Sequence, residues 1–173
     1  MKQIKLPISD KESASLNAGD IISLSGIIYT ARDAAHKRIC EALAKGEPAP
    51  LNLDGAVIYY CGPTPAREGE IIGSCGPTTS ARMDDYAPAL IEHGAKIMIG
   101  KGKRSQSVTD ALVRFGGLYL VAVGGAGALM KSYVKTCTPV AYTDLGCEAV
   151  YRLQVENMEL IVGTDSRGKS VLK

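Results

Sequence analysis

Hydrophobic and polar positions along the chain follow two alternating periods, that of strands and that of helices. β-branched and other apolar residues fill 21–30, which predicts a strand, and apolar residues then recur at helical spacing over 31–44. The same succession continues downstream, with strands expected at 56–60, 96–99 and 118–123 and helices at 80–93, 105–115 and 127–133. This alternation is typical of parallel βαβ units with right-handed crossovers.

Other segments of the chain show strand character without intervening helices. Such strands are expected at 134–142, 150–155 and 160–163, and turns are expected at 17–20 and 165–168. We therefore expect the fold class to be α/β, with a parallel central sheet and a second, more antiparallel β layer. The length of 173 residues suits a single domain over 1–173.

Charge and hydropathy indicate which partners and which cellular compartment to expect. Twenty Lys+Arg against eighteen Asp+Glu leave a net charge of +2, which is too small to indicate binding to nucleic acid or to an anionic membrane. The longest apolar runs fall far short of the roughly 20 residues that a membrane-spanning helix needs. The first residues lack the apolar core of a signal peptide. We expect a cytoplasmic protein with no nucleic acid and no membrane as partner.

The cysteines do not form a recognisable metal motif. No two are spaced as C-x-x-C among Cys40, Cys61, Cys75, Cys137 and Cys147. The odd number and the missing secretion signal argue against a disulfide scaffold. We interpret them as small buried hydrophobic residues in a reducing compartment, with a site formed by three convergent cysteines as the alternative.

The segment 76–84 carries the first candidate site. A Gly- and Pro-rich connection over 61–77 leads to it, and connections of this length in a compact domain are usually functional or disordered. Thr78 and Thr79 lie at an expected helix start, where free N–H groups and the helix dipole attract anions, and Arg82 follows within one turn. This combination suits a carboxylate or a phosphate. A plain helix cap with a solvated arginine is the alternative.

Two further junctions between a strand and a helix each offer a cation. Arg32 lies where the strand 21–30 ends, which is where α/β sheets bind ligands, and Asp33 is a candidate cap of the following helix. We interpret His36, one turn further on, as a half-buried helix histidine. Lys101 stands between two glycines after the strand 96–99, where the backbone can approach a ligand closely.

Neighbouring charges and glycines have plainer interpretations. We take Lys103 and Arg104 as surface charges, and the glycine-rich run 124–127 as close packing of a strand against a helix, since it lacks the spacing of a dinucleotide site. Three cations at the carboxyl ends of parallel strands suit a small dicarboxylate. No nucleotide loop, local metal motif or Ser–His–Asp spacing accompanies them, so the chain is equipped to hold a substrate but not to activate it alone.

Four segments in one order resemble a known family. They are Tyr29–Arg38 (YTARDAAHKR), Tyr59–Pro63 (YYCGP), Gly76–Asp84 (GPTTSARMD) and Lys101–Ser105 (KGKRS). Together they resemble the β subunit, or C-terminal domain, of class I iron–sulfur fumarate hydratases and L-tartrate dehydratases. The resemblance extends from about residue 26 to residue 168.

The resemblance implies a hydro-lyase and a swivelling β/β/α domain. It implies that Arg32, Arg82 and Lys101 bind the substrate carboxylates, that Thr79 adds a hydrogen bond, and that Thr78 is a catalytic residue in proton transfer. The [4Fe-4S] cluster of such enzymes belongs to a partner α subunit, so this chain is expected to hold no cofactor or metal and to be inactive alone. A lone β subunit would expose its partner-facing surface, and a homodimer is one way to cover it.

Three alternatives remain open at this stage. The substrate that the resemblance favours is fumarate, hydrated to (S)-malate, and L(+)-tartrate is the alternative. A non-catalytic module that binds small anions would instead bind carboxylate or phosphate tightly without a partner. A self-contained metal enzyme would carry stoichiometric iron or zinc.

Overall fold

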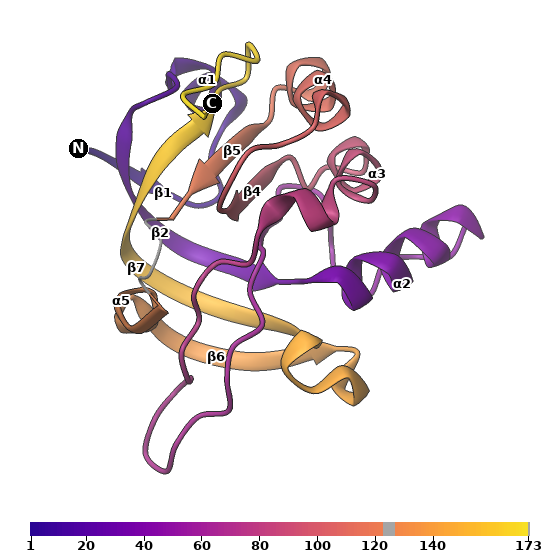
Figure 1. Ribbon diagram of the computed structural model, residues 1–173, viewed down its shortest axis with the longest axis vertical. Coiled ribbons are helices and arrows are strands. Elements are labelled where there is room, and N and C mark those ends of the chain that lie inside the picture. Colours follow the sequence, from indigo (N-terminus) through magenta and orange to yellow (C-terminus); the bar gives the residue numbers. More distant parts are fainter. Residues whose placement is uncertain (123–126, 173) are drawn as a thin grey trace.

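The computed structural model describes residues 1–122 and 127–172, and its strands and helices alternate through the middle of the chain (Figure 1). The strands are β1 (Lys2–Lys5), β2 (Ile21–Thr30), β3 (Val57–Tyr59), β4 (Ile97–Gly100), β5 (Leu118–Val121), β6 (Val134–Ala141) and β7 (Val150–Thr164). The α-helices are α1 (Asp10–Ser15), α2 (Asp33–Ala44), α3 (Ala87–Glu92), α4 (Gln106–Phe115) and α5 (Gly127–Ser132). Two 3-10 helices are η1 (Ser80–Met83) and η2 (Thr143–Glu148).

The strands of the described residues form one mixed sheet of seven, in the order β1-β2-β3-β4-β5-β7-β6. Neighbours from β1 to β5 are parallel, whereas β7 runs antiparallel to β5, β6 and β2. Because β2 pairs with both β3 and β7, the strands β2, β3, β4, β5 and β7 close into a ring. The expected α/β class is confirmed. The second, more antiparallel β layer is not a separate sheet among the described residues, because β6 and β7 pair antiparallel within this same hydrogen-bonded sheet.

Side chains that alternate along each strand divide the core between the two faces of the sheet. Along β3, Val57 and Tyr59 join the cluster enclosed by the strands, while Ile58 joins the cluster under the helices. All three are buried, as expected of a parallel strand covered on both faces. Figure 1 shows α2, α3 and α4 on one side of the sheet. No helix in the described part of the chain is long and apolar enough to cross a membrane.

Two expected elements have different boundaries in the structure. The two strands expected at 150–155 and 160–163 are one strand, β7, in which Asn157 adopts a positive φ of 53°. Its polar residues interrupt the hydrophobic pattern, and the pairing with β2 shifts register beside them, between Leu24 and Gly26, and then continues. The helix expected at 80–93 is divided into η1 and α3, because Pro88 has no backbone N–H to donate within a continuous helix and instead lies in the first turn of α3.

The glycine-rich run at 124–127 falls mostly outside the described residues. Gly127 alone belongs to the described part, at the start of α5. Its carbonyl accepts a hydrogen bond from the Cys75 N–H (3.4 Å), and a Cβ at Gly76 would lie 3.3 Å from its Cα. Gly127 therefore packs closely against the end of the long connection that follows β3, which Figure 1 shows projecting away from the sheet.

Candidate functional site

The carboxyl ends of three parallel strands place three loops side by side. β2 pairs with β3 through Thr30 and Tyr59, and β3 pairs with β4 through Tyr59 and Ile99. Just beyond these ends lie Arg32, at the N-cap of α2, and Lys101, after β4. Because neighbouring parallel strands end at the same edge of a sheet, both cations are brought to that edge.

Backbone hydrogen bonds return the segment around Thr78 to the same edge. The Thr78 N–H donates to the Tyr60 carbonyl (2.6 Å), and Thr79 forms a parallel bridge with Lys101. The Ser80 N–H donates to the Lys101 carbonyl (3.0 Å), and its Oγ accepts from the Lys101 N–H (3.1 Å). A Cβ at Gly100 would collide with this hydroxyl, so the close approach requires glycine there. Thr78, Thr79 and Lys101 are therefore neighbours.

Arg82 and Arg32 meet across one carboxylate. The Nε of Arg82 donates to Oδ1 of Asp33 at 3.0 Å. The Nε of Arg32 lies 3.8 Å from Oδ2 of Asp33 and 3.8 Å from Oε1 of Glu148. These last three atoms are buried and have no hydrogen-bond partner within the described residues. Since Thr79 is the N-cap of η1 and Arg82 lies within this short helix, the arginines and the threonine–lysine pair share one edge.

The five residues proposed from the sequence are thus brought together, although their exposure differs. Thr79, Arg82 and Lys101 are exposed, and Arg32 and Thr78 are half-buried. The cluster contains three cations and two carboxylates, so it keeps an excess of positive charge. Free N–H donors in forked guanidinium geometry, a lysine ammonium and two hydroxyls can hold a small anion with more than one carboxylate.

The sequence did not indicate that Glu148 belongs to this cluster, and it did not show the role of Asp33. Asp33 was expected to cap α2, but the N-cap is Arg32 and its side chain makes no capping hydrogen bond. Asp33 instead pairs with Arg82 and lies beside Arg32. Glu148 reaches the site from the end of η2, far along the chain, and no local pattern marks it.

Known proteins of one family are similar to this chain in sequence. Residues 1–173 match the family described as "Fumarase C-terminus" over their whole length. The chain belongs to this family. It is 39% identical over 97% of its length to "Fumarate hydratase 2" of Leishmania major, and 41% identical over 85% to "Fumarate hydratase class I, aerobic" of Escherichia coli K12.

The fumarase C-terminus chain spans only part of those two relatives, 30% and 27% of their respective lengths. A third relative has a similar size. The "Putative L(+)-tartrate dehydratase subunit beta" of Methanocaldococcus jannaschii is 39% identical over 95% of this chain, and the match covers 87% of that protein.

Behind the candidate edge, Arg104 is buried, so its interpretation as a surface charge was wrong. Its side chain is 1% exposed and lies between the rings of Tyr60 and Tyr119, each centred 5.0 Å away. Its Nε donates to Asp84 (2.7 Å) and its Nη2 to the Tyr60 hydroxyl (3.2 Å). Burial raises the pKa of Tyr119 to about 12, and its hydroxyl donates to Ser80 Oγ (2.9 Å). Arg104 therefore supports the floor beneath Thr79 and Lys101.

His36 is also more deeply buried than the half-buried histidine expected at that position. It is 1% exposed, and its Nδ1 donates to the Arg32 carbonyl at 2.8 Å. Its ring meets the Tyr60 ring edge-on at 5.3 Å. Burial lowers the pKa of His36 to about 4, so the ring is neutral near pH 7. We therefore assign it a structural role in holding the backbone at Arg32.

This burial makes the stability of the protein depend on pH. We expect the free energy of unfolding to fall by about 2 kcal/mol between pH 7 and pH 5. The unfolded chain binds a proton at His36 below its ordinary pKa of 6.5, whereas the folded chain stays neutral down to about 4. The contribution is complete above pH 6.5 and is lost as the pH falls toward 4. Urea unfolding at the two pH values measures it.

The second histidine provides the control for this experiment. His93 is exposed, and its ring contacts the Ala89 carbonyl at 2.8 Å. A His93→Asn variant should keep the full pH dependence, whereas a His36→Asn variant should lose most of it. The same dependence in both variants would show that His36 is not its source.

The cysteines of this fumarase C-terminus chain differ in burial. Cys61 and Cys75 are buried as expected, but Cys147 is exposed. A hydrogen bond with Cys75, and then burial, raise the pKa of Cys61, while the hydrogen bond with Cys61 lowers the pKa of Cys75. Within residues 1–122 and 127–172, no three His, Cys, Asp or Glu side chains are grouped to hold a metal ion.

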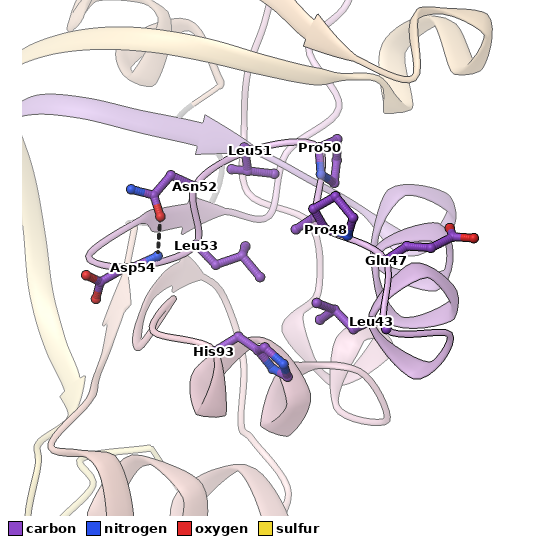
Figure 2. A pocket seen from close by; sticks show the side chains of 11 residues that line it. Leu43, Glu47, Pro48, Pro50, Leu51, Asn52, Leu53, Asp54 and His93 are labelled. Carbon is purple, nitrogen blue, oxygen red and sulfur yellow. Dashed lines mark hydrogen bonds between the residues drawn. The ribbon is translucent and has the colours of Figure 1, made fainter.

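A hollow of about 770 Å³ lies away from the candidate edge, between the end of α2 and the loop 46–54 (Figure 2). Leu43 and His93 also line it, whereas no Lys or Arg among the residues that the structure describes does so. Arg32 lies at the opposite end of α2, about 18 Å away for twelve residues at 1.5 Å each. The hollow is unsuited to a dicarboxylate and takes no part in the site.

Proposed function

We propose that this chain is the β subunit of a two-component hydro-lyase that hydrates fumarate reversibly to (S)-malate. The observation that carries the proposal is the meeting of Arg32, Arg82 and Lys101 around Thr78 and Thr79 at one edge of the sheet. The names of the relatives support it, since two are fumarate hydratases and the one of similar length is a β subunit.

In this proposal the residues of the chain hold the substrate. The guanidinium groups of Arg32 and Arg82 and the ammonium of Lys101 bind the two carboxylates, and the Thr79 hydroxyl adds a hydrogen bond. Thr78 takes part in proton transfer at its Oγ1. Because a threonine hydroxyl is a weak base in water, this role requires neighbouring cations to stabilise the negative charge that develops on the oxygen.

The rest of the chemistry belongs to a partner in this proposal. An iron–sulfur α subunit carries the [4Fe-4S] cluster, which supplies the Lewis acid, and this chain closes over it as a swivelling domain in the cytoplasm. The name of one relative supports a partner subunit, because the M. jannaschii protein, 87% of which is covered by the match, is called a subunit beta.

L(+)-tartrate is the second candidate substrate. The M. jannaschii relative of matching length is named a putative L(+)-tartrate dehydratase subunit. Tartrate carries one hydroxyl more than malate, so the polarity of the pocket around that carbon decides between them. We favour fumarate, because two relatives that are 39% and 41% identical to this chain are named fumarate hydratases.

Turnover measured with and without the partner tests the function. We expect the purified chain alone to convert neither fumarate nor L-tartrate, and the chain assembled with an iron–sulfur α subunit to form malate from fumarate. Conversion by the chain alone, or no conversion of either acid by the assembled enzyme, would overturn the proposal. Tight binding of phosphate by the isolated chain, measured by calorimetry, would favour a non-catalytic anion-binding module instead.

A further inference from the structure

A buried oxygen of Glu148 faces the Arg32 guanidinium without a hydrogen bond. Oε1 of Glu148 and Nε of Arg32 are 3.8 Å apart, and neither has a hydrogen-bond partner among the described residues. Buried charged groups usually satisfy their hydrogen bonds, and an unsatisfied one is costly. A glutamate held in this position therefore calls for a role at the site.

Asp33 and the backbone of Gly62 also restrict the position of the Arg32 side chain. Oδ2 of Asp33 lies 3.8 Å from Nε, which thus stands between two carboxylates. A Cβ at Gly62 would lie 2.9 Å from Nη1 and 2.8 Å from Cδ of Arg32, so the Gly62 backbone packs against the side chain. The arginine is enclosed by charge and by backbone, although its side chain is still 23% exposed.

Long-range contacts hold Glu148 in its place. Asp144, in the same 3-10 helix, accepts two hydrogen bonds from Arg38 of α2, at 2.9 and 2.6 Å. After Glu148, the Tyr151 N–H donates to Oγ1 of Thr30 (3.1 Å), at the end of β2. The glutamate is therefore tied to the two elements between which Arg32 lies, and its position relative to Arg32 is set by the fold.

We propose that Glu148 is a positioning residue for substrate binding, which together with Asp33 holds the Arg32 guanidinium where it can grip one carboxylate of the dicarboxylate. The inference rests on the proposed function and deepens it. Glu148 acts through Arg32 and does not contact the substrate itself. Asp33 also pairs with Arg82, so Glu148 is the carboxylate that serves Arg32 without engaging the other arginine.

Kinetics of the assembled enzyme test this role. Arg32 grips the carboxylate in the ground state and in the transition state alike, so misplacing it weakens both equally and raises KM more than it lowers kcat. We expect Glu148→Gln to raise the KM for fumarate and the inhibition constant of succinate by about five- to tenfold, with kcat within about twofold of wild type. Glu148→Asp, which keeps the charge, should recover part of the loss.

A double-variant cycle separates positioning from structural support. In an Arg32→Met background, Glu148→Gln should raise KM no further, because the group that it positions is gone. Glu159→Gln, an exposed charge change on β7, is the matched control and should leave KM unchanged. Melting temperatures of all variants show whether folding is affected.

The outcomes distinguish this inference from the function on which it rests. A raised KM for Glu148→Gln that disappears in the Arg32→Met background supports it. An unchanged KM for Glu148→Gln, or effects on KM that add in the double variant, overturns the role of Glu148. If Arg32→Met still impairs the enzyme in that case, the proposed function stands. Normal kinetics of both Arg32→Met and Arg82→Met would overturn the substrate site itself.

Discussion

An Arg32→Met variant of the assembled enzyme should lose about tenfold or more of its kcat/KM for fumarate, and Arg82→Met should do the same, because each charge-assisted contact contributes about 1.5–3 kcal/mol. Both side chains reach one edge of the sheet, where they share Asp33. Methionine keeps most of the aliphatic length and removes only the charged fork. Initial rates over a range of fumarate concentrations measure the effect.

A remote arginine provides the control for these two variants. Arg114 is exposed near the end of α4, so Arg114→Met removes the same charge without touching the candidate edge. We expect its kcat/KM to match wild type. Near-normal turnover of both Arg32→Met and Arg82→Met would show that the dicarboxylate binds elsewhere.

The largest effect on stability is expected at Arg104. Arg104→Met should lower the free energy of unfolding by about 3–5 kcal/mol, because it removes one partner of a buried ion pair and leaves the other charge uncompensated. The carboxylate of Asp84 would lose its 2.7 Å partner, and the Tyr60 hydroxyl would lose its donor. Urea unfolding near pH 7 measures the change.

The preceding residue offers a matched control for this stability experiment. Lys103 is exposed, and substitutions of this kind usually change stability by no more than about 0.5 kcal/mol. Lys103→Met should therefore unfold as wild type does. A loss below about 1 kcal/mol for Arg104→Met would mean that Asp84 finds another partner and that the floor of the site does not depend on the arginine.

The parallel centre of the fold could be predicted from the sequence because its signals are local. β3 and β4 are short, continuously apolar runs, which is what burial on both faces of a sheet requires. The helix α4 begins after Ser105 and ends at Gly116, whose φ of 68° is the left-handed geometry of a helix C-terminus. Each of these features is visible within a few residues of sequence.

The remaining features depend on contacts between distant segments. The sequence of the turn that contains Lys103 and Arg104 suggests that both side chains are solvated. The packing of Tyr60 and Tyr119 around Arg104 shows that this side chain is buried. Glu148 joins the candidate edge because β7 pairs with β2 and brings the end of η2 to Arg32. Sequence motifs could indicate the cations of the site, but not the carboxylates that hold them.

A structure of the assembled enzyme with succinate bound is the most direct test of the central claim. Succinate has both carboxylates and lacks the double bond, so it occupies the site without reacting. We expect its two carboxylates to contact Arg32, Arg82 and Lys101, with the Thr78 hydroxyl beside the carbons that separate them. Succinate bound away from this edge, or in contact with only one of the three cations, would contradict the account.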